Sequence, residues 1–82
     1  MSKADKMFKK LGFEKYLLIN KRKQTWGEKW INNRSLTMVT FDYIDKEICC
    51  STTEFNAEPI YIGINILQAI NIRCKELEWL DE

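Results

Sequence analysis

Two groups of residues in this chain have types that could take part in chemistry: its cysteines and a basic segment that contains tryptophans. Cys49 and Cys50 are adjacent, Cys74 lies further along, and the chain contains no histidine. Neighbouring side chains point to opposite faces of a strand, so the first two thiols cannot share a metal ion there. The sequence also lacks a Gly-rich phosphate loop, a GxSxG turn and any metal-ligand spacing. We therefore expect no enzyme activity, no metal and no cofactor.

Residues 20–34, with the sequence NKRKQTWGEKWINNR, have the composition of a nucleic-acid contact. Cations neutralise phosphates, and aromatic rings stack against bases. The residues of these types are Lys21, Arg22, Lys23, Trp26, Lys29, Trp30 and Arg34. The alternative interpretation is structural, because tryptophans are usually core residues and exposed lysines at a turn maintain solubility. The sequence leaves both interpretations open.

Charge is sorted along the chain. Residues 1–34 contain ten Lys and Arg against three acids, a net charge of +7, whereas residues 35–82 contain three against nine, a net charge of −6. Such polarity can steer an anionic ligand, pair two halves of one fold or drive association between copies. In a compact domain the two halves partly neutralise one another. The pattern therefore favours oriented association over general affinity for nucleic acid.

Length and composition indicate one small folded domain over residues 1–82. A chain of 82 residues, 45% of them hydrophobic, can bury an adequate core without a metal or disulfides. The lysine-rich start lacks the apolar region of a signal peptide, and no apolar run approaches the roughly 20 residues of a membrane span. Three cysteines, two of them adjacent, suit no disulfide framework. We expect a cytoplasmic protein with reduced thiols and no membrane association.

Local patterns place helices at both ends of the chain and strands between them. Ser2 and Asp5 resemble a capping box, and a helix over residues 3–11 ends before Gly12. The segments that follow are expected to be strands over 14–20, 24–31, 36–44 and 47–53, a loop over 54–59, a short edge strand over 60–62 and a helix over 64–80.

These elements predict an α+β fold, in which a three- to four-stranded antiparallel sheet is flanked by an N-terminal helix and a longer C-terminal helix. Both helices should cover one face of the sheet and leave the other partly open. Trp26, Trp30 or Tyr43 on that open face would bury against a partner.

On a helical wheel, residues 64–80 have one apolar stripe and two apolar residues opposite it. The stripe contains Ile66, Leu67, Ile70, Cys74, Leu77 and Leu80. Ile72 and Trp79 lie on the opposite side, so we expect both to be exposed. Two large apolar residues on an outer face indicate a partner or dimer surface. The alternatives are scattered exposure, or a last turn that frays and lets Trp79 fold under the sheet.

Both ends of the chain resemble small uncharacterised proteins encoded by phages and prophages of Gram-positive bacteria. The similar residues, about a third of the chain, are Ala4 to Phe13, Phe41-Asp42, Lys46-Glu47, Leu67 to Asn71, Cys74, Glu76-Leu77 and Trp79. This chain departs from them in its longer, more basic segment over residues 20–35. It also has Glu78 where a glycine often precedes the tryptophan. The resemblance implies no catalytic or binding residues.

Together these features favour a non-enzymatic accessory or interaction protein that binds another protein or a second copy of itself. Ile72 and Trp79, with the opposed charges of the two halves, are the basis of this prediction. The alternative is a nucleic-acid-binding module that uses residues 20–34.

Overall fold

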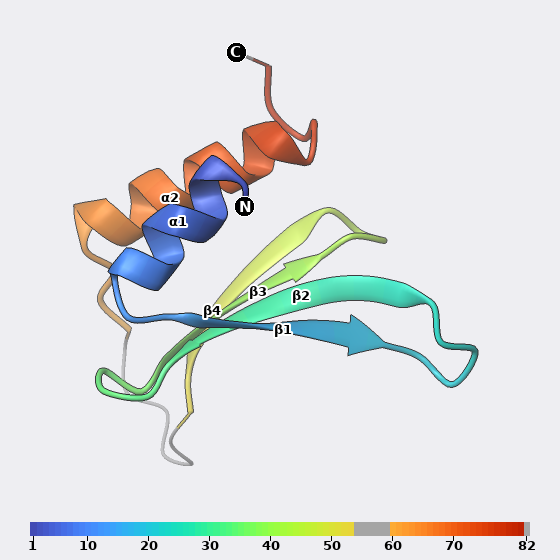
Figure 1. The fold of residues 1–82 in the computed structure, drawn as a ribbon, viewed down its shortest axis with the longest axis horizontal. Helices are drawn as coiled ribbons and strands as arrows, with labels where there is room; N and C mark the ends of the chain where they lie inside the picture. Colours follow the sequence, from blue (N-terminus) through green and yellow to red (C-terminus); the bar gives the residue numbers. More distant parts are fainter. Residues whose placement is uncertain (54–59, 82) are drawn as a thin grey trace.

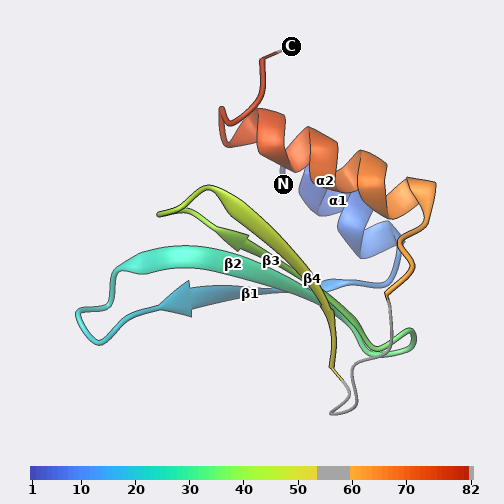
Figure 2. The ribbon, with the colours of Figure 1, turned by 180° about the vertical axis from the view of Figure 1, so that it is seen from behind.

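The computed structural model describes residues 1–53 and 60–81. The elements, in chain order, are α1 (Lys3–Lys10), β1 (Glu14–Ile19), β2 (Thr25–Asn32), β3 (Thr37–Asp42), β4 (Glu47–Thr52) and α2 (Ile64–Glu76). The strands form one antiparallel sheet in the order β1-β2-β3-β4, and both helices lie over one of its faces (Figures 1 and 2). The predicted α+β fold is therefore confirmed.

Two sequence predictions concern the connection between β4 and α2. The expected edge strand over residues 60–62 is wrong, because the structure assigns these residues to no strand. The expected loop over 54–59 lies outside the described residues. Neither described helix has the length and apolar content that crossing a bilayer requires.

Helix α1 begins and ends as its sequence predicts. The Ser2 hydroxyl accepts a hydrogen bond from the Asp5 backbone N–H at 3.0 Å, which satisfies one donor of the first turn. Ala4 and Phe8 are fully buried, whereas the lysines of the helix are exposed. Gly12, with a φ of +96°, turns the chain out of the helix. The helix therefore presents one apolar stripe to the sheet.

An aromatic cluster joins α1 to the sheet. The Phe8 ring stacks on the Trp30 ring with centroids 4.6 Å apart, and it meets the rings of Phe13 and Phe41 edge to face at 5.5 and 6.2 Å. All four side chains are buried, as is Val39 beside them. Of the two interpretations that the sequence leaves open for Trp30, the core one is correct, because its face of β2 is the face that α1 covers.

The strand register shows which residues share each face. Leu17, Glu28, Phe41 and Ile48 are paired in one row across the sheet, on the face that carries the buried Phe41. The neighbouring row, Tyr16, Lys29, Thr40 and Cys49, lies on the opposite, uncovered face, because strand side chains alternate. Tyr43 does not belong to the open face, since its ring packs against the core.

Helix α2 ends at Glu76, four residues before the predicted end. Glu78 has a φ of +62°, the Glu78 N–H donates to the Lys75 carbonyl at 3.0 Å, and the Trp79 N–H donates to the Cys74 carbonyl at 2.8 Å. This pair of bonds is a Schellman termination. Trp79 therefore leaves the helical path and packs on Phe41, with ring centroids 6.2 Å apart.

The predicted apolar stripe of this helix is correct in part. Ile70 and Cys74 are buried, and Ile66 and Leu77 pack against the core. Leu67 and Leu80, however, are 53% and 46% exposed. The buried Ala69 takes a core position that the wheel does not give it. The real helix presents a narrower apolar surface than the sequence predicts.

Candidate functional site

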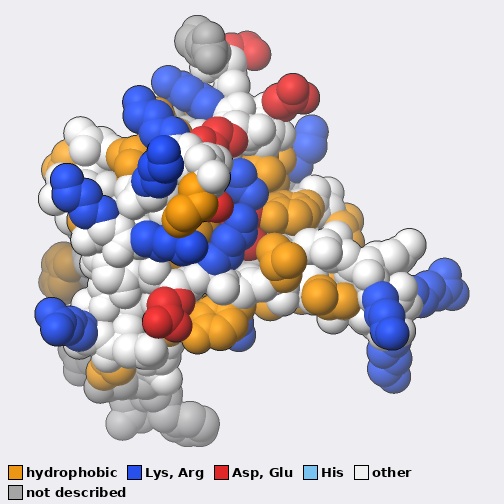
Figure 3. All heavy atoms as spheres, in the orientation of Figure 1, with side chains coloured by type: hydrophobic (Ala, Val, Ile, Leu, Met, Phe, Trp, Pro, Cys, Tyr) orange, Lys and Arg blue, Asp and Glu red, His pale blue; other side chains and the backbone are white. Residues whose placement is uncertain are grey.

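The structure separates the cations of the predicted nucleic-acid segment. Lys21, Arg22 and Lys23 are exposed at the tip of the β1–β2 hairpin, and Arg34 is exposed in the turn at the far end of β2. Strand β2 has eight residues, which span roughly 25 Å at the usual strand rise. Figure 3 shows the basic side chains of the tip well apart from those over the helices.

The aromatic and remaining basic residues of that segment are divided between faces. Trp30 is fully buried against Phe8, so its ring has no free face for a base. Trp26 is half-buried and lies at the register shift, where it is the extra residue of β2 between the partners of Leu18 and Ile19. Lys29 is half-buried in the uncovered-face row. The structure thus leaves the three cations of the tip without an exposed tryptophan platform.

Ile72 and Trp79 do not form the exposed pair that the helical wheel predicts. Both are half-buried. Trp79 packs on Phe41 at the core, because the chain leaves the helical path before it reaches Trp79. Ile72 lines a shallow groove of about 380 Å³ with Lys3, Lys75 and Glu76. The prediction that these two residues are exposed is therefore wrong.

The three thiols occupy different environments. Burial raises the pKa of Cys74, an effect that the nearby Arg73 cation opposes, and burial also raises the pKa of Cys50. Cys49 is exposed on the uncovered face. Over residues 1–53 and 60–81, no group of three or more His, Cys, Asp or Glu side chains could hold a metal ion. This arrangement gives no support to thiol or metal chemistry.

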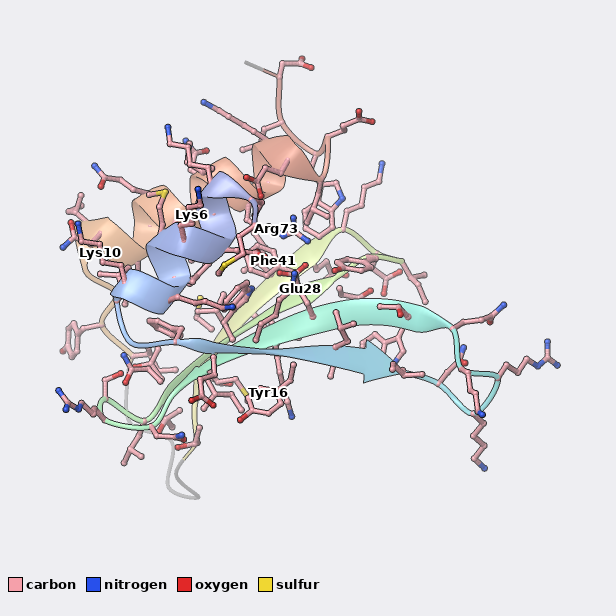
Figure 4. The ribbon with its side chains drawn as sticks, in the orientation of Figure 1. Lys6, Lys10, Tyr16, Glu28, Phe41 and Arg73 are labelled. Carbon is pink, nitrogen blue, oxygen red and sulfur yellow. The ribbon has the colours of Figure 1, made fainter. Side chains whose placement is uncertain are left out.

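A buried carboxylate lies at the centre of the molecule. Glu28 is fully buried, and its oxygens accept hydrogen bonds from Trp30 Nε1 at 2.6 Å and from the Tyr43 hydroxyl at 2.5 Å. Arg73 donates from Nε to both oxygens at 3.0 and 3.1 Å, and from Nη2 to Oε1. Figure 4 shows Arg73 extending from α2 toward Glu28 on β2.

The network continues from Arg73 to the start of α1. Arg73 Nη1 donates to Glu76 Oε1 at 3.2 Å, and Glu76 Oε2 accepts from the Ala4 backbone N–H at 3.1 Å. A single chain of polar contacts therefore links β2, α2 and the first turn of α1. The acceptor at that turn also suits the positive end of the helix dipole.

Together, the hydrogen bonds lower the pKa of Glu28 by more than its burial raises it. Burial alone would raise the pKa of Glu28, but the bonds from Arg73, Tyr43 and Trp30 hold that pKa below its ordinary value. Burial and the Glu28 carboxylate raise the pKa of Tyr43 to about 12. Because Glu28 is fully buried on β2 and accepts hydrogen bonds from Arg73 on α2, the network helps to orient α2 on the sheet.

Sequence reasoning missed this network, although one signal was present. Glu28 lies between Trp26 and Trp30 at strand spacing, so an acid shares a face with two tryptophans. A carboxylate in that position requires a buried donor. Its partner Arg73, 45 residues away, has no local signature.

The strongest candidate for an interaction surface is strand β1. It forms one edge of the sheet among the residues that the structure describes, so the outer side of its backbone has no strand beside it. Tyr16, Leu17 and Ile19 are 43%, 53% and 55% exposed, and Leu18 is half-buried. Leu17 belongs to the covered face and Tyr16 to the open face. This edge is therefore apolar on both sides.

Few devices protect this edge from pairing. The charged Lys15 is turned toward the helices, where its Nζ lies 3.5 Å from Asp5 Oδ1 and 5.5 Å from the Trp30 ring centroid. A register shift between Leu18 and Ile19 limits regular pairing to the first five residues of the strand. Native sheets usually place lysine or proline on exposed edges. Residues 16–19 of β1 contain neither.

Comparison with known proteins adds no relative: no family model, curated protein or solved structure matches this chain.

Proposed function

We propose that this chain is a non-enzymatic interaction protein that binds another protein chain along the β1 edge of its sheet. The observation that carries the proposal is the exposure of Tyr16, Leu17 and Ile19 on an edge strand. An extended segment can add to such an edge through main-chain hydrogen bonds, while its alternate side chains select the partner. Residues 16–19 supply apolar contacts on both sides of the added strand.

The exposed apolar residues of β1 support an interaction role that does not depend on Ile72 and Trp79. When a partner covers exposed apolar side chains, their removal from water stabilises the complex by about 25 cal/mol per Å² of apolar surface buried. An accessory protein of a phage or prophage, acting in the cytoplasm, is part of the same proposal. Its supports are the resemblance of both chain ends to such proteins and the three free cysteines.

A selection from a library of displayed random peptides tests the proposal. We expect enriched peptides to be extended and apolar at alternate positions, and their binding to slow amide exchange in β1. Leu17→Lys should abolish capture, because a lysine at the edge must lose its hydration when a strand is added. Leu67→Lys on α2 is the matched control, since Leu67 is also 53% exposed. Enrichment that Leu17→Lys leaves unchanged would contradict the proposal.

Nucleic-acid binding is the outcome that would replace this function. The three exposed cations of the hairpin tip are the ones that lie together, since Arg34 is exposed at the far end of β2. Tight binding of labelled DNA or RNA, with a steep salt dependence that triple substitution of residues 21–23 reduces, would favour the alternative. We expect only weak binding at low salt, because three phosphate contacts release few counterions.

A further inference from the structure

The two edges of the sheet differ in a complementary way. The row Leu18, Gly27, Asp42 and Glu47 crosses all four strands just before both hairpin turns. The β1–β2 tip and the β3–β4 tip therefore lie at the same end of the sheet. The first tip belongs to one edge and the second tip to the other. Figures 1 and 2 show the β1–β2 tip extending away from the helices and the β3–β4 tip near the C-terminal end of α2.

The charges of the two tips are opposite. The β1–β2 tip carries the exposed cations Lys21, Arg22 and Lys23. The β3–β4 tip carries Asp42, Asp45 and Glu47 with one cation, Lys46. The net charges are +3 and −2, counted from these residues. The inner strands of the two tips, β2 and β3, are neighbours, whereas their outer strands, β1 and β4, form the two edges and present the charge of each tip toward another chain.

The apolar residues of the two edges also match. Leu17 on β1 and Ile48 on β4 end the same row, on the same face, and are 53% and 38% exposed. Ile44, beside the acidic tip, is 74% exposed. A β4 edge placed beside a β1 edge in this register would bring Ile48 against Leu17 as a cross-strand apolar pair.

We propose that the partner of the β1 edge is the β4 edge of a second copy of this chain. This inference rests on the proposed function and names its partner. Alternating strand directions make β4 antiparallel to β1 of a copy displaced across the sheet, so the sheet continues without reversal. The displacement keeps the helices of both copies on one face. It also places the basic tip of one copy beside the acidic tip of the next.

This arrangement has a defined size and stoichiometry. A pair of short strands buries less than a standard interface of about 1,600 Å², so we expect weak association that becomes extensive only toward about 1 mM. The interface is head-to-tail, because it uses different surfaces on the two copies. Among the residues that the structure describes, each added copy leaves β1 and residues 47–51 of β4 at the two ends of the assembly, so association continues beyond the dimer.

Sedimentation equilibrium of lysine variants tests the proposal. The wild-type chain should show a weight-average mass that rises with concentration and does not level at the dimer. Leu17→Lys and Ile48→Lys should each be monomeric, because each blocks one edge. An equimolar mixture of the two variants should form a one-to-one dimer, since each supplies the edge that the other lacks. Leu67→Lys should associate like the wild type. Raising the salt from about 0.05 to 0.5 M should weaken association severalfold.

Three other outcomes of these experiments would show which proposal fails. A wild-type chain that stays monomeric at about 1 mM would overturn the self-association, while β1-dependent capture of peptides would leave the proposed function standing. A plateau at the dimer that Leu17→Lys abolishes and Ile48→Lys spares would show β1 pairing with β1 instead. Association that neither lysine affects would place the interface elsewhere and overturn both proposals.

Discussion

Replacing Arg73 with methionine should show how much of the domain's stability depends on the cation beside the buried carboxylate of Glu28. Glu28 is fully buried, and Arg73 is the only positive charge among its hydrogen-bond donors in the described part of the chain. Arg73→Met leaves two neutral donors, from Trp30 and Tyr43. Removing one partner of a buried pair costs about 3–5 kcal/mol. The whole domain is expected to be stable by only about 4–12 kcal/mol, so this loss is large.

The assay is urea denaturation at several pH values. With a slope near 1 kcal/mol per M for a small domain, the midpoint at pH 7 should fall by roughly 3–5 M. Lys75→Met, on the same helix but outside the network, is the control and should change stability by less than about 0.5 kcal/mol.

The pH dependence distinguishes a charge effect from a packing effect. In the wild type the pKa of Glu28 is below its unfolded value of about 4.3, so its stabilisation is present above that pH and is lost as pH falls through the folded pKa. Without Arg73, burial should raise this pKa above the unfolded value. The difference between wild type and variant should then narrow from pH 7 to pH 4. A difference below about 1 kcal/mol at pH 7, or one that is constant with pH, would refute the reasoning.

Three further predictions follow from the helix termination and the network. Glu78→Gly should raise stability by about 0.5–1 kcal/mol, and the melting temperature by several degrees, because glycine adopts the φ of +62° without strain; an unchanged melting curve would contradict this. Trp79→Ala should cost roughly 2 kcal/mol through lost core packing, whereas Ile72→Ala should cost less than about 1 kcal/mol; chemical denaturation that reverses this order would contradict the placement of Trp79. Tyr43 should ionise near pH 12 in ultraviolet titration, and Tyr43→Phe should remove that step. Because its folded pKa is raised, its stabilisation should be lost as the pH rises from 10 to 12.

Local signals predicted the elements well where a residue has a local role. The Ser2 cap, the Gly12 turn and the strand boundaries each follow from neighbouring residues, and the structure agrees to within about two residues. The end of α2 did not follow. The helical wheel predicted a helix to residue 80, but the left-handed backbone conformation of Glu78 ends the helix at Glu76.

The candidate site depends on long-range facts that patterns along the chain do not contain. Alternation places Trp26, Glu28 and Trp30 on one face, but it does not say which face the helices cover. The pairing of Glu28 with Arg73 requires α2 to lie over β2. The identity of the edge strands depends on the order of the whole sheet, so the exposure of Leu17 was not predictable. The charge sorting was visible in the sequence, and the structure places part of it on two opposite edges.

Amide hydrogen exchange at two protein concentrations tests the edge association most directly. We expect the amides of β1 and β4 to exchange more slowly at about 1 mM than at about 20 μM, while those of β2 and β3 do not change with concentration. Leu17→Lys should remove the difference in both edge strands at once. Equal exchange of β1 at the two concentrations, with the wild-type chain shown to be folded, would contradict the association of β1 with β4.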